Sequence, residues 1–537
     1  MDPDYADQAI AEFLTEPLRA IPPGIGFDAG LVLREAVAAR RRRLLRDWSL
    51  LALTVLFFVT SGIGWALAWL VVGLLVSLVG WRRADSDTTT ADFTGTGGRV
   101  RRRLIVRICK AVLSYGSGAI VLLGIALLGA VVAAALAASA GELDLSGLSP
   151  QPTPPGVSQV LFGLLILAVL AADRFALSSL LTRSFRRGTF SSHPTLTEWQ
   201  GERWLRTLGH PRHQVDFERI DNADLAGNLV VYRGVEPFVG AGVTRNPISF
   251  AIPLEPAIDD DLGPGVQPFT MTELYDHVSR QLLALRDSHS LSPSGRLAGL
   301  AEYEQVIVPA DELLVNFGDP MSTLVLPSLD QPPEQSIAPE PLSRLTENSL
   351  EWMRYYRCYR LEAWDRDVTL SCYLHFGAGE RMLYVEWIPC LLLPVDRRFR
   401  QVDQVPIAPL RPLRDGVLDL IRLPYTLPIR TVRLFRRIRS TSQAAGTVQA
   451  DRYGAWSSLR ELGAGASMNN YFQTTDVDRY LKVLQTRMTR AIGEFLDARG
   501  IASTEFLAQA AQVVHNETYI DKVVGNVATG GVHGDRR

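Results

Sequence analysis

The feature that most constrains this chain is an apolar block between residues 49 and 181. No charged residue occurs from Ser49 to Trp81, and two further uncharged runs cover residues 111–140 and 145–172. A helix crosses a bilayer with about 20 apolar residues, so the first run is too long for one ordinary span. The block therefore predicts a helical membrane domain to which the rest of the chain is attached.

Turn and charge signals indicate how the block is divided. Ser61-Gly62-Ile63-Gly64 is a turn sequence inside the first run, and arginines flank that run at 40–46 and at 82–83. Because positive residues favour the inner face of a membrane, we expect the run to enter and return as a hairpin. The loop 141–156 contains Glu142 and Asp144 but no basic residue, which places it outside.

The predicted fold class is four membrane-spanning α-helices in two hairpins, followed by a cytosolic α+β domain with an antiparallel sheet. The spans are expected at about 45–61, 64–81, 111–138 and 157–180. Both termini are then cytosolic, and the protein lies in the inner (cytoplasmic) membrane. The alternative has three spans, with 49–81 as one tilted helix and the first arginine cluster outside.

Composition and periodicity divide the rest of the chain. The predicted divisions are N-terminal helices at 1–44, a transmembrane domain at 45–182, a first α+β part at 183–326, a Pro-rich linker at 327–343, a second α+β part at 344–514 and a Gly-rich tail at 515–537. In the second part, alternating residues predict strands over 355–363, 368–376 and 381–393, joined as an antiparallel meander. Apolar periodicity predicts helices over 270–287 and 475–499.

A basic amphipathic segment at 397–439 is the second informative stretch. It contains arginine but no lysine, interleaved with aliphatic residues, a pattern suited to the anionic inner face of a membrane. The residues predicted to contact the membrane surface are Arg422, Arg430, Arg433, Arg436, Arg437 and Arg439. The alternative is a solvated basic face of the soluble domain. The segment lacks a nucleic-acid recognition module, so we expect no nucleic-acid partner.

Motifs for catalysis, cofactors and metals are missing from the sequence. The lysines Lys110, Lys482 and Lys522 do not follow a Gly-rich loop, which excludes Walker-type nucleotide binding. Proline separates His210 from His213, and no nearby acid completes a set of metal ligands. The Gly-Ala-Gly at 240–242 is too short for a dinucleotide-binding loop and predicts a turn. We therefore expect no cofactor and no metal, and favour a protein without enzymatic activity.

Two short segments carry a resemblance to a known group. YRGVEPFVGAG at 232–242 and MLYVEW at 382–387 resemble an uncharacterised actinobacterial family of multi-span membrane proteins, over about residues 200–537. In that family, membrane helices precede a cytosolic α+β region and a Gly-rich tail follows it. The family has no assigned activity, so the resemblance supplies no functional residues. The tail is also similar to short Gly-rich amyloid-forming signalling motifs of bacteria.

The sequence thus favours an integral membrane protein whose cytosolic α+β domain binds a protein partner or a ligand. One alternative is a membrane effector in stress or defence signalling that is recruited through its Gly-rich tail. A second is a membrane-anchored enzyme, which a folded cluster of acids or histidines would support. The expected partners are the lipid bilayer and anionic lipids at 397–439, and the pattern leaves homo-oligomers open.

Overall fold

The computed structural model describes residues 2–26, 28–84, 157–185, 227–256, 266–286, 297–379, 381–404, 410–440 and 450–512. These residues fall into two compact units that interleave along the sequence. The sheet unit contains residues 1–39, 197–401 and 446–537, and the helical unit contains residues 40–196 and 402–445.

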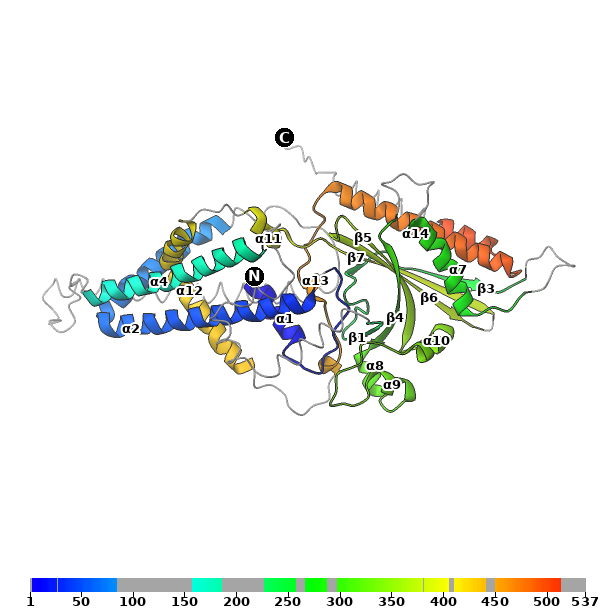
Figure 1. Ribbon diagram of the computed structural model, residues 1–537, viewed down its shortest axis with the longest axis horizontal. Helices are drawn as coiled ribbons and strands as arrows, with labels where there is room; N and C mark the ends of the chain where they lie inside the picture. The colour runs from blue at the N-terminus through cyan, green and yellow to red at the C-terminus, as the bar shows by residue number, and fades with distance from the viewer. Residues whose placement is uncertain are drawn as a thin grey trace, which may run out of the picture. The chain divides into compact units, whose positions relative to one another are not determined.

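The sheet unit is built on a seven-stranded mixed sheet that curls around its apolar core (Figure 1). Its strands are β1 (Leu229–Tyr232), β2 (Val243–Thr244), β3 (Ile248–Pro253), β4 (Leu300–Pro309), β5 (Arg354–Ala363), β6 (Val368–Ala378) and β7 (Met382–Leu392). The order is β1-β4-β5-β6-β7-β2, and β3 also pairs with β7. The predicted meander is confirmed as β5–β6–β7, whereas β1 joins β4 in parallel. Strands from both sides of the Pro-rich segment 327–343 therefore share one sheet.

Two helices cover one face of this sheet and lie side by side (Figure 1). They are α7 (Met271–Leu283) and α14 (Tyr471–Ala498), which match the predicted helices. Thr270 begins α7 with a capping box, in which its hydroxyl and the Glu273 carboxylate each accept the other's backbone N–H. Leu274 and Val278 of α7 and Met488 of α14 are fully buried against the sheet.

Shorter helices complete the sheet unit. They are α1 (Pro3–Phe13), α8 (Ala310–Val315), α9 (Pro320–Val325), α10 (Pro339–Glu347), α11 (Arg397–Arg400) and α13 (Leu459–Leu462). Single turns of 3-10 helix cover Ala284–Arg286 and Ala450–Arg452, and a third, Gln401–Gln404, begins at the last residue of the segment 197–401 and continues in the helical unit. The Pro-rich segment supplies the first turn of α10, because proline at a first helical position loses no backbone hydrogen bond. Leu342 and Leu345 of α10 are buried in the main core.

The helical unit contains the greater part of α2 (Ala29–Ala84), α4 (Val157–Leu180) with a π-helical end at Leu181–Phe185, and α12 (Arg411–Ser440). The prediction of four spans in two hairpins is wrong. The helix α2 continues through Ser61–Gly64 without the predicted turn, since the segment has no proline and an isolated glycine weakens a helix by only about 1 kcal/mol. Among the described residues, one stretch, Leu161–Leu180, is long and apolar enough to cross a membrane.

Several predicted features lie outside the described residues. These are the span at 111–138, the loop at 141–156, the histidines His210 and His213, and the Gly-rich tail from 515.

Candidate functional site

A cleft opens beside the first half of β4. β1 pairs with β4 only from Val306 to Pro309, so in the described part of the chain residues 300–305 have β5 on one side and the cleft on the other. We call this space the β4 cleft. Its volume is about 1170 Å³, enough for a small-molecule ligand, whose sites typically measure about 300–1,000 Å³. Residues of β4, β5, α7 and α14 form most of its wall.

Strand alternation sends the residues of the cleft to both faces of the sheet. Glu302 and Glu304 of β4 lie on the face that α7 covers, together with Arg357 of β5. Arg360 of β5 and Tyr303 of β4 lie on the opposite face. The cleft therefore brings two chemically different walls together around one strand edge.

The wall under α7 is a closed polar network centred on Arg357. The Arg357 guanidinium lies 2.8 Å from Asp276, 3.2 Å from Glu302 and 3.6 Å from Glu304. Ser279 donates a hydrogen bond of 2.7 Å to Glu302. The Tyr355 hydroxyl donates one of 2.7 Å to Glu304.

Burial raises the pKa of Tyr355, which keeps this hydroxyl protonated as a donor. Each group in this wall thus has a partner, and the network holds the wall in place.

The opposite wall has a buried cation without a counter-ion. The Arg360 side chain is only 7 % exposed and stacks on the Tyr303 ring, with its Cζ 4.5 Å from the ring centroid. Its Nε is buried without a hydrogen-bond partner, and no described carboxylate pairs with the guanidinium. The Gln305 Oε1 in the same cleft is also buried and unpartnered. Buried charges are normally paired, so this wall lacks an anion.

The cleft is lined by five carboxylates and four guanidiniums, so the case for an anion depends on how these groups are paired and not on their total charge. All five of its carboxylates pair with a guanidinium: Asp276, Glu302 and Glu304 with Arg357, Glu273 with Arg499, and Glu362 with Arg366. Arg280 is exposed and hydrogen-bonds only to a backbone carbonyl, that of Asp276. Among the described residues, the two cleft guanidiniums without a carboxylate partner are therefore Arg280 and Arg360.

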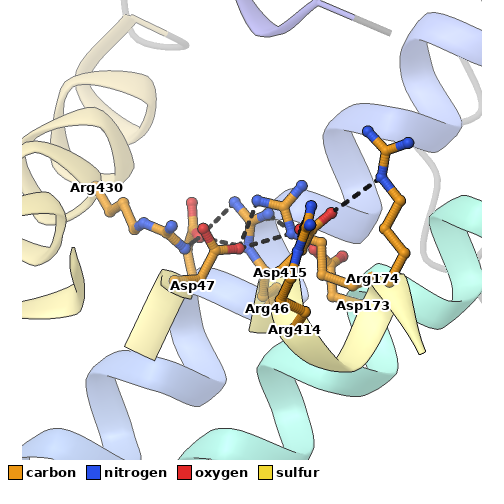
Figure 2. A network of polar contacts seen from close by, with 9 residues as sticks. Arg46, Asp47, Asp173, Arg174, Arg414, Asp415 and Arg430 are labelled. Carbon is orange, nitrogen blue, oxygen red and sulfur yellow. Dashed lines mark hydrogen bonds and ion pairs between the residues drawn. The ribbon is translucent and has the colours of Figure 1, made fainter. Parts of the chain in front are cut away.

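The arginines predicted to contact a membrane surface lie on α12. Arg422 is exposed. Arg430 is 15 % exposed and lies 3.3 Å from Asp47 of α2, within the polar network of the helical unit shown in Figure 2. The side chains of Arg433, Arg436, Arg437 and Arg439 lie outside the described residues. Membrane-surface contact by these six arginines stays a prediction.

The Gly-Ala-Gly at 240–242 forms the predicted turn and is closed by an internal anion. The backbone N–H groups of Gly240 and Gly242 each donate a hydrogen bond of 2.9 Å to Oε1 of Glu461. Both glycines have positive φ, and a Cβ at Gly242 would lie 2.2 Å from the Leu391 carbonyl oxygen. Only glycine fits this position, and the N–H groups that could bind a phosphate are already occupied.

A comparison with protein-family models matches residues 247–533 to the AbeC-like domain, which is more than half of the chain. The chain belongs to the AbeC-like domain family. The match runs from β3 to beyond α14 and includes the β4 cleft residues Arg357 and Arg360. It identifies the domain, whereas an actinobacterial source and a multi-span membrane family stay predictions. No curated protein and no solved structure matches the chain.

Sequence reasoning missed the cleft of the AbeC-like domain. The available signal was the spacing of three arginines in β5, since residues 354 and 360 share one face of a strand while 357 lies on the other. Charged residues at buried strand positions indicate ion pairs or a ligand, because burial without a partner is unfavourable. The pattern does not reveal which of the three is left unpaired.

Proposed function

We propose that the AbeC-like domain binds an anionic ligand in the β4 cleft, and that the protein acts by binding rather than by catalysis. The observation that carries this proposal is the buried Arg360 guanidinium, which has no counter-ion among the described residues. A carboxylate or phosphate group on the ligand would supply that charge and could bind the planar guanidinium through two parallel hydrogen bonds.

The surroundings of Arg360 support an oxyanion over an apolar ligand. Stacking on Tyr303 fixes the guanidinium plane and leaves its N–H edges available for hydrogen bonds. Gln305 offers a second polar group, whose unpartnered Oε1 would accept a hydrogen bond from a donor on the same ligand, such as a hydroxyl. The exposed Arg280 adds positive charge at the same cleft.

The proposal is tested by substituting Arg360 in the full chain in detergent. Thermal unfolding is measured with inorganic phosphate, acetate and a nucleoside monophosphate as probes. We expect at least one oxyanion to stabilise the wild type, by about 2.7 kcal/mol at a concentration of 100 Kd, and Arg360→Gln to lose this response. Without ligand, the free energy of unfolding of Arg360→Gln is expected to equal that of the wild type or to be higher by about 1–3 kcal/mol, because the substitution removes an unsatisfied buried group.

Arg344→Gln is the matched control, because Arg344 is 73 % exposed on α10. It is expected to keep both the stability and the ligand response. An Arg360→Gln protein that responds to oxyanions like the wild type, or that is strongly destabilised without ligand, contradicts the proposal. Separate phosphate and carboxylate probes distinguish the two sources of the oxyanion.

The hypothesis of a membrane-anchored enzyme depends on clustered acids or histidines. The β4 cleft does gather acids, and Ser279 lies between Glu302 and the Tyr359 hydroxyl. Each of these acids is already held by an arginine, as described above. Among the described residues, no group of three or more potential ligands is placed to hold a metal ion. Binding is therefore the function that this geometry supports best.

A further inference from the structure

Among the described residues of the helical unit, an ion pair joins each two of the helices α2, α4 and α12. Arg46 of α2 lies 3.0 Å from Asp173 of α4. Arg430 of α12 lies 3.3 Å from Asp47 of α2. The third pair joins Arg174 of α4 to Asp419 of α12, with Nε to Oδ2 at 2.6 Å. We call these six residues the ion triangle, and Figure 2 shows five of them, Arg46, Asp47, Asp173, Arg174 and Arg430, converging from the three helices.

An apolar core lies next to the ion triangle. Leu50 of α2, Ile166 and Leu170 of α4, and Leu423 of α12 are buried together. Gly416 of α12 lies directly against the backbone of α4, where its Cβ position would be 3.2 Å from Ala171. The helices therefore pack closely, and Asp173 and Arg174 of α4 pair with α2 and α12.

The exposed side chains of α4 are apolar, whereas α12 also exposes Arg414 and Arg422. On α4, Leu161 is 54 % exposed, Leu164 57 % and Phe175 47 %. Large apolar residues are also exposed on the two neighbours of α4: Trp48, Val55 and Leu56 on α2, and Leu413, Leu418 and Ile421 on α12. On α4 the charged residues Asp173 and Arg174 are paired with the neighbouring helices and the leucines are exposed, which is the reverse of a helix in a water-soluble bundle.

We propose that α4 lies among lipid acyl chains, that α2 and α12 pack against one side of it, and that the ion triangle neutralises Asp173 and Arg174, the charges that α4 brings into the bilayer. The stretch Leu161–Leu180 has 20 residues and a mean hydropathy of 2.0, which is the length that crosses a hydrocarbon core of about 30 Å. Asp173 and Arg174 lie six or seven residues before Leu180, so the triangle lies about 10 Å from that end.

Lipid fits this surface better than a protein partner does. Charged residues inside a bilayer face the bundle and pair with one another, which is the arrangement of the ion triangle. A protein interface of this kind would instead carry a polar rim around its apolar centre, whereas the exposed leucines of α4 extend along the helix. The inference concerns the helical unit alone and does not depend on the ligand proposed for the β4 cleft.

The first test replaces an exposed leucine of α4 in the full chain. Membranes from expressing cells are extracted with alkaline carbonate, and purified protein is reconstituted into neutral phosphatidylcholine vesicles. The wild type is expected to stay in the membrane fraction and to enter neutral vesicles. Leu164→Arg is expected to reduce the carbonate-resistant fraction about tenfold, because arginine is strongly disfavoured among acyl chains. Val315→Arg, at a residue of α8 that is 78 % exposed, is the control and leaves that fraction unchanged.

The second test concerns the ion triangle. Arg174→Asp and Asp419→Arg are each expected to lower the yield of folded, membrane-embedded protein severalfold, because each leaves like charges facing one another. The double variant, which exchanges the two charges, is expected to recover most of that yield, and Arg344→Asp, at an arginine of α10 that is 73 % exposed, serves as the single-charge control. The inference is overturned if carbonate releases the wild type, if Leu164→Arg stays in the membrane fraction, or if the wild type binds only to anionic vesicles. It is also overturned if the double variant gives no more folded protein than the single variants.

Discussion

At the scale of single residues, the carboxyl group of Glu461 connects the turn at 240–242 to α13 through hydrogen bonds. It accepts hydrogen bonds from Gly240, Gly242 and Ser458 N–H groups and from the Ser457 hydroxyl. Burial nonetheless raises the pKa of Glu461 above its ordinary value of 4.5, against the opposing effect of these donors. Burial therefore disfavours the charged form of Glu461 by more than the hydrogen bonds favour it.

This raised pKa predicts a pH dependence with a definite sign. Between 4.5 and the folded pKa, the folded state binds more protons at Glu461 than the unfolded state does, so this group's contribution to stability decreases as pH rises. Glu461→Gln removes that contribution. The free energy of unfolding of Glu461→Gln minus that of the wild type is therefore expected to increase with pH through this window.

Urea unfolding of both proteins at a series of pH values measures this difference. Glu340→Gln, at an exposed residue that is 80 % accessible on α10, is the control and should give a flat difference. A Glu461→Gln difference that stays constant or decreases as pH rises would show that the pKa of Glu461 is not raised in the folded state.

At the scale of elements, Gly416 sets how closely α12 approaches α4. A side chain at Gly416 would meet the Ala171 backbone at 3.2 Å, closer than ordinary contact. Gly416→Ile is therefore expected to separate the two helices and to lower stability by about 1–3 kcal/mol, as for other overpacked sites. Val417→Ile, at the neighbouring residue that is 39 % exposed, should change stability little. Thermal unfolding in detergent compares the two variants, and equal effects would contradict the close approach.

The elements also show which structural features the sequence could predict. The meander β5–β6–β7 and the helices α7 and α14 were predictable, because alternation, helical periodicity and a capping box each act within a few residues. The hairpin at Ser61–Gly64 failed because a glycine pair only permits a turn, and α2 continues as a helix there. Local signals indicate which secondary structures a segment can adopt, and packing determines which of these it adopts.

The candidate site was beyond the reach of these local signals. Arg357 and Arg360 lie in the same strand, three residues apart, yet one meets three carboxylates and the other meets none in the described chain. That difference depends on α7, which brings Asp276 over one face of the sheet, and on the pairing of β4 with β5. Long-range pairing of this kind leaves no mark in the spacing of the residues. The contact between Arg174 and Asp419 could not be predicted for the same reason, because it joins residues far apart in the sequence.

At the scale of the whole molecule, the limits of the family match differ from those of the folded units. Residues 247–533 omit β1 and β2, although β1 is the parallel neighbour of β4. The same range includes α12, which belongs to the helical unit. The sheet unit is therefore completed by residues that the family match does not cover.

This interleaving predicts how fragments of the chain behave. A fragment 247–537 exposes the backbone groups of Val306 and Val308 that pair with β1, and it uncovers their buried side chains. Unpaired strand edges with apolar residues promote aggregation, so we expect this fragment to aggregate. A fragment 185–537 also lacks residues 1–184 but contains β1 and β2. We expect it to be more soluble than 247–537 and to unfold more cooperatively.

Size-exclusion chromatography and thermal unfolding in the same detergent compare the two fragments. Because both lack α2 and α4 and both carry an unpartnered α12, a difference between them reports on residues 185–246, the segment that contains β1 and β2. A monomeric 247–537 fragment that unfolds as cooperatively as 185–537 would mean that the family match marks an independent folding unit. The opposite result assigns the completion of the sheet, and with it the rim of the β4 cleft at Gly227 and Asn228, to the chain that precedes the match.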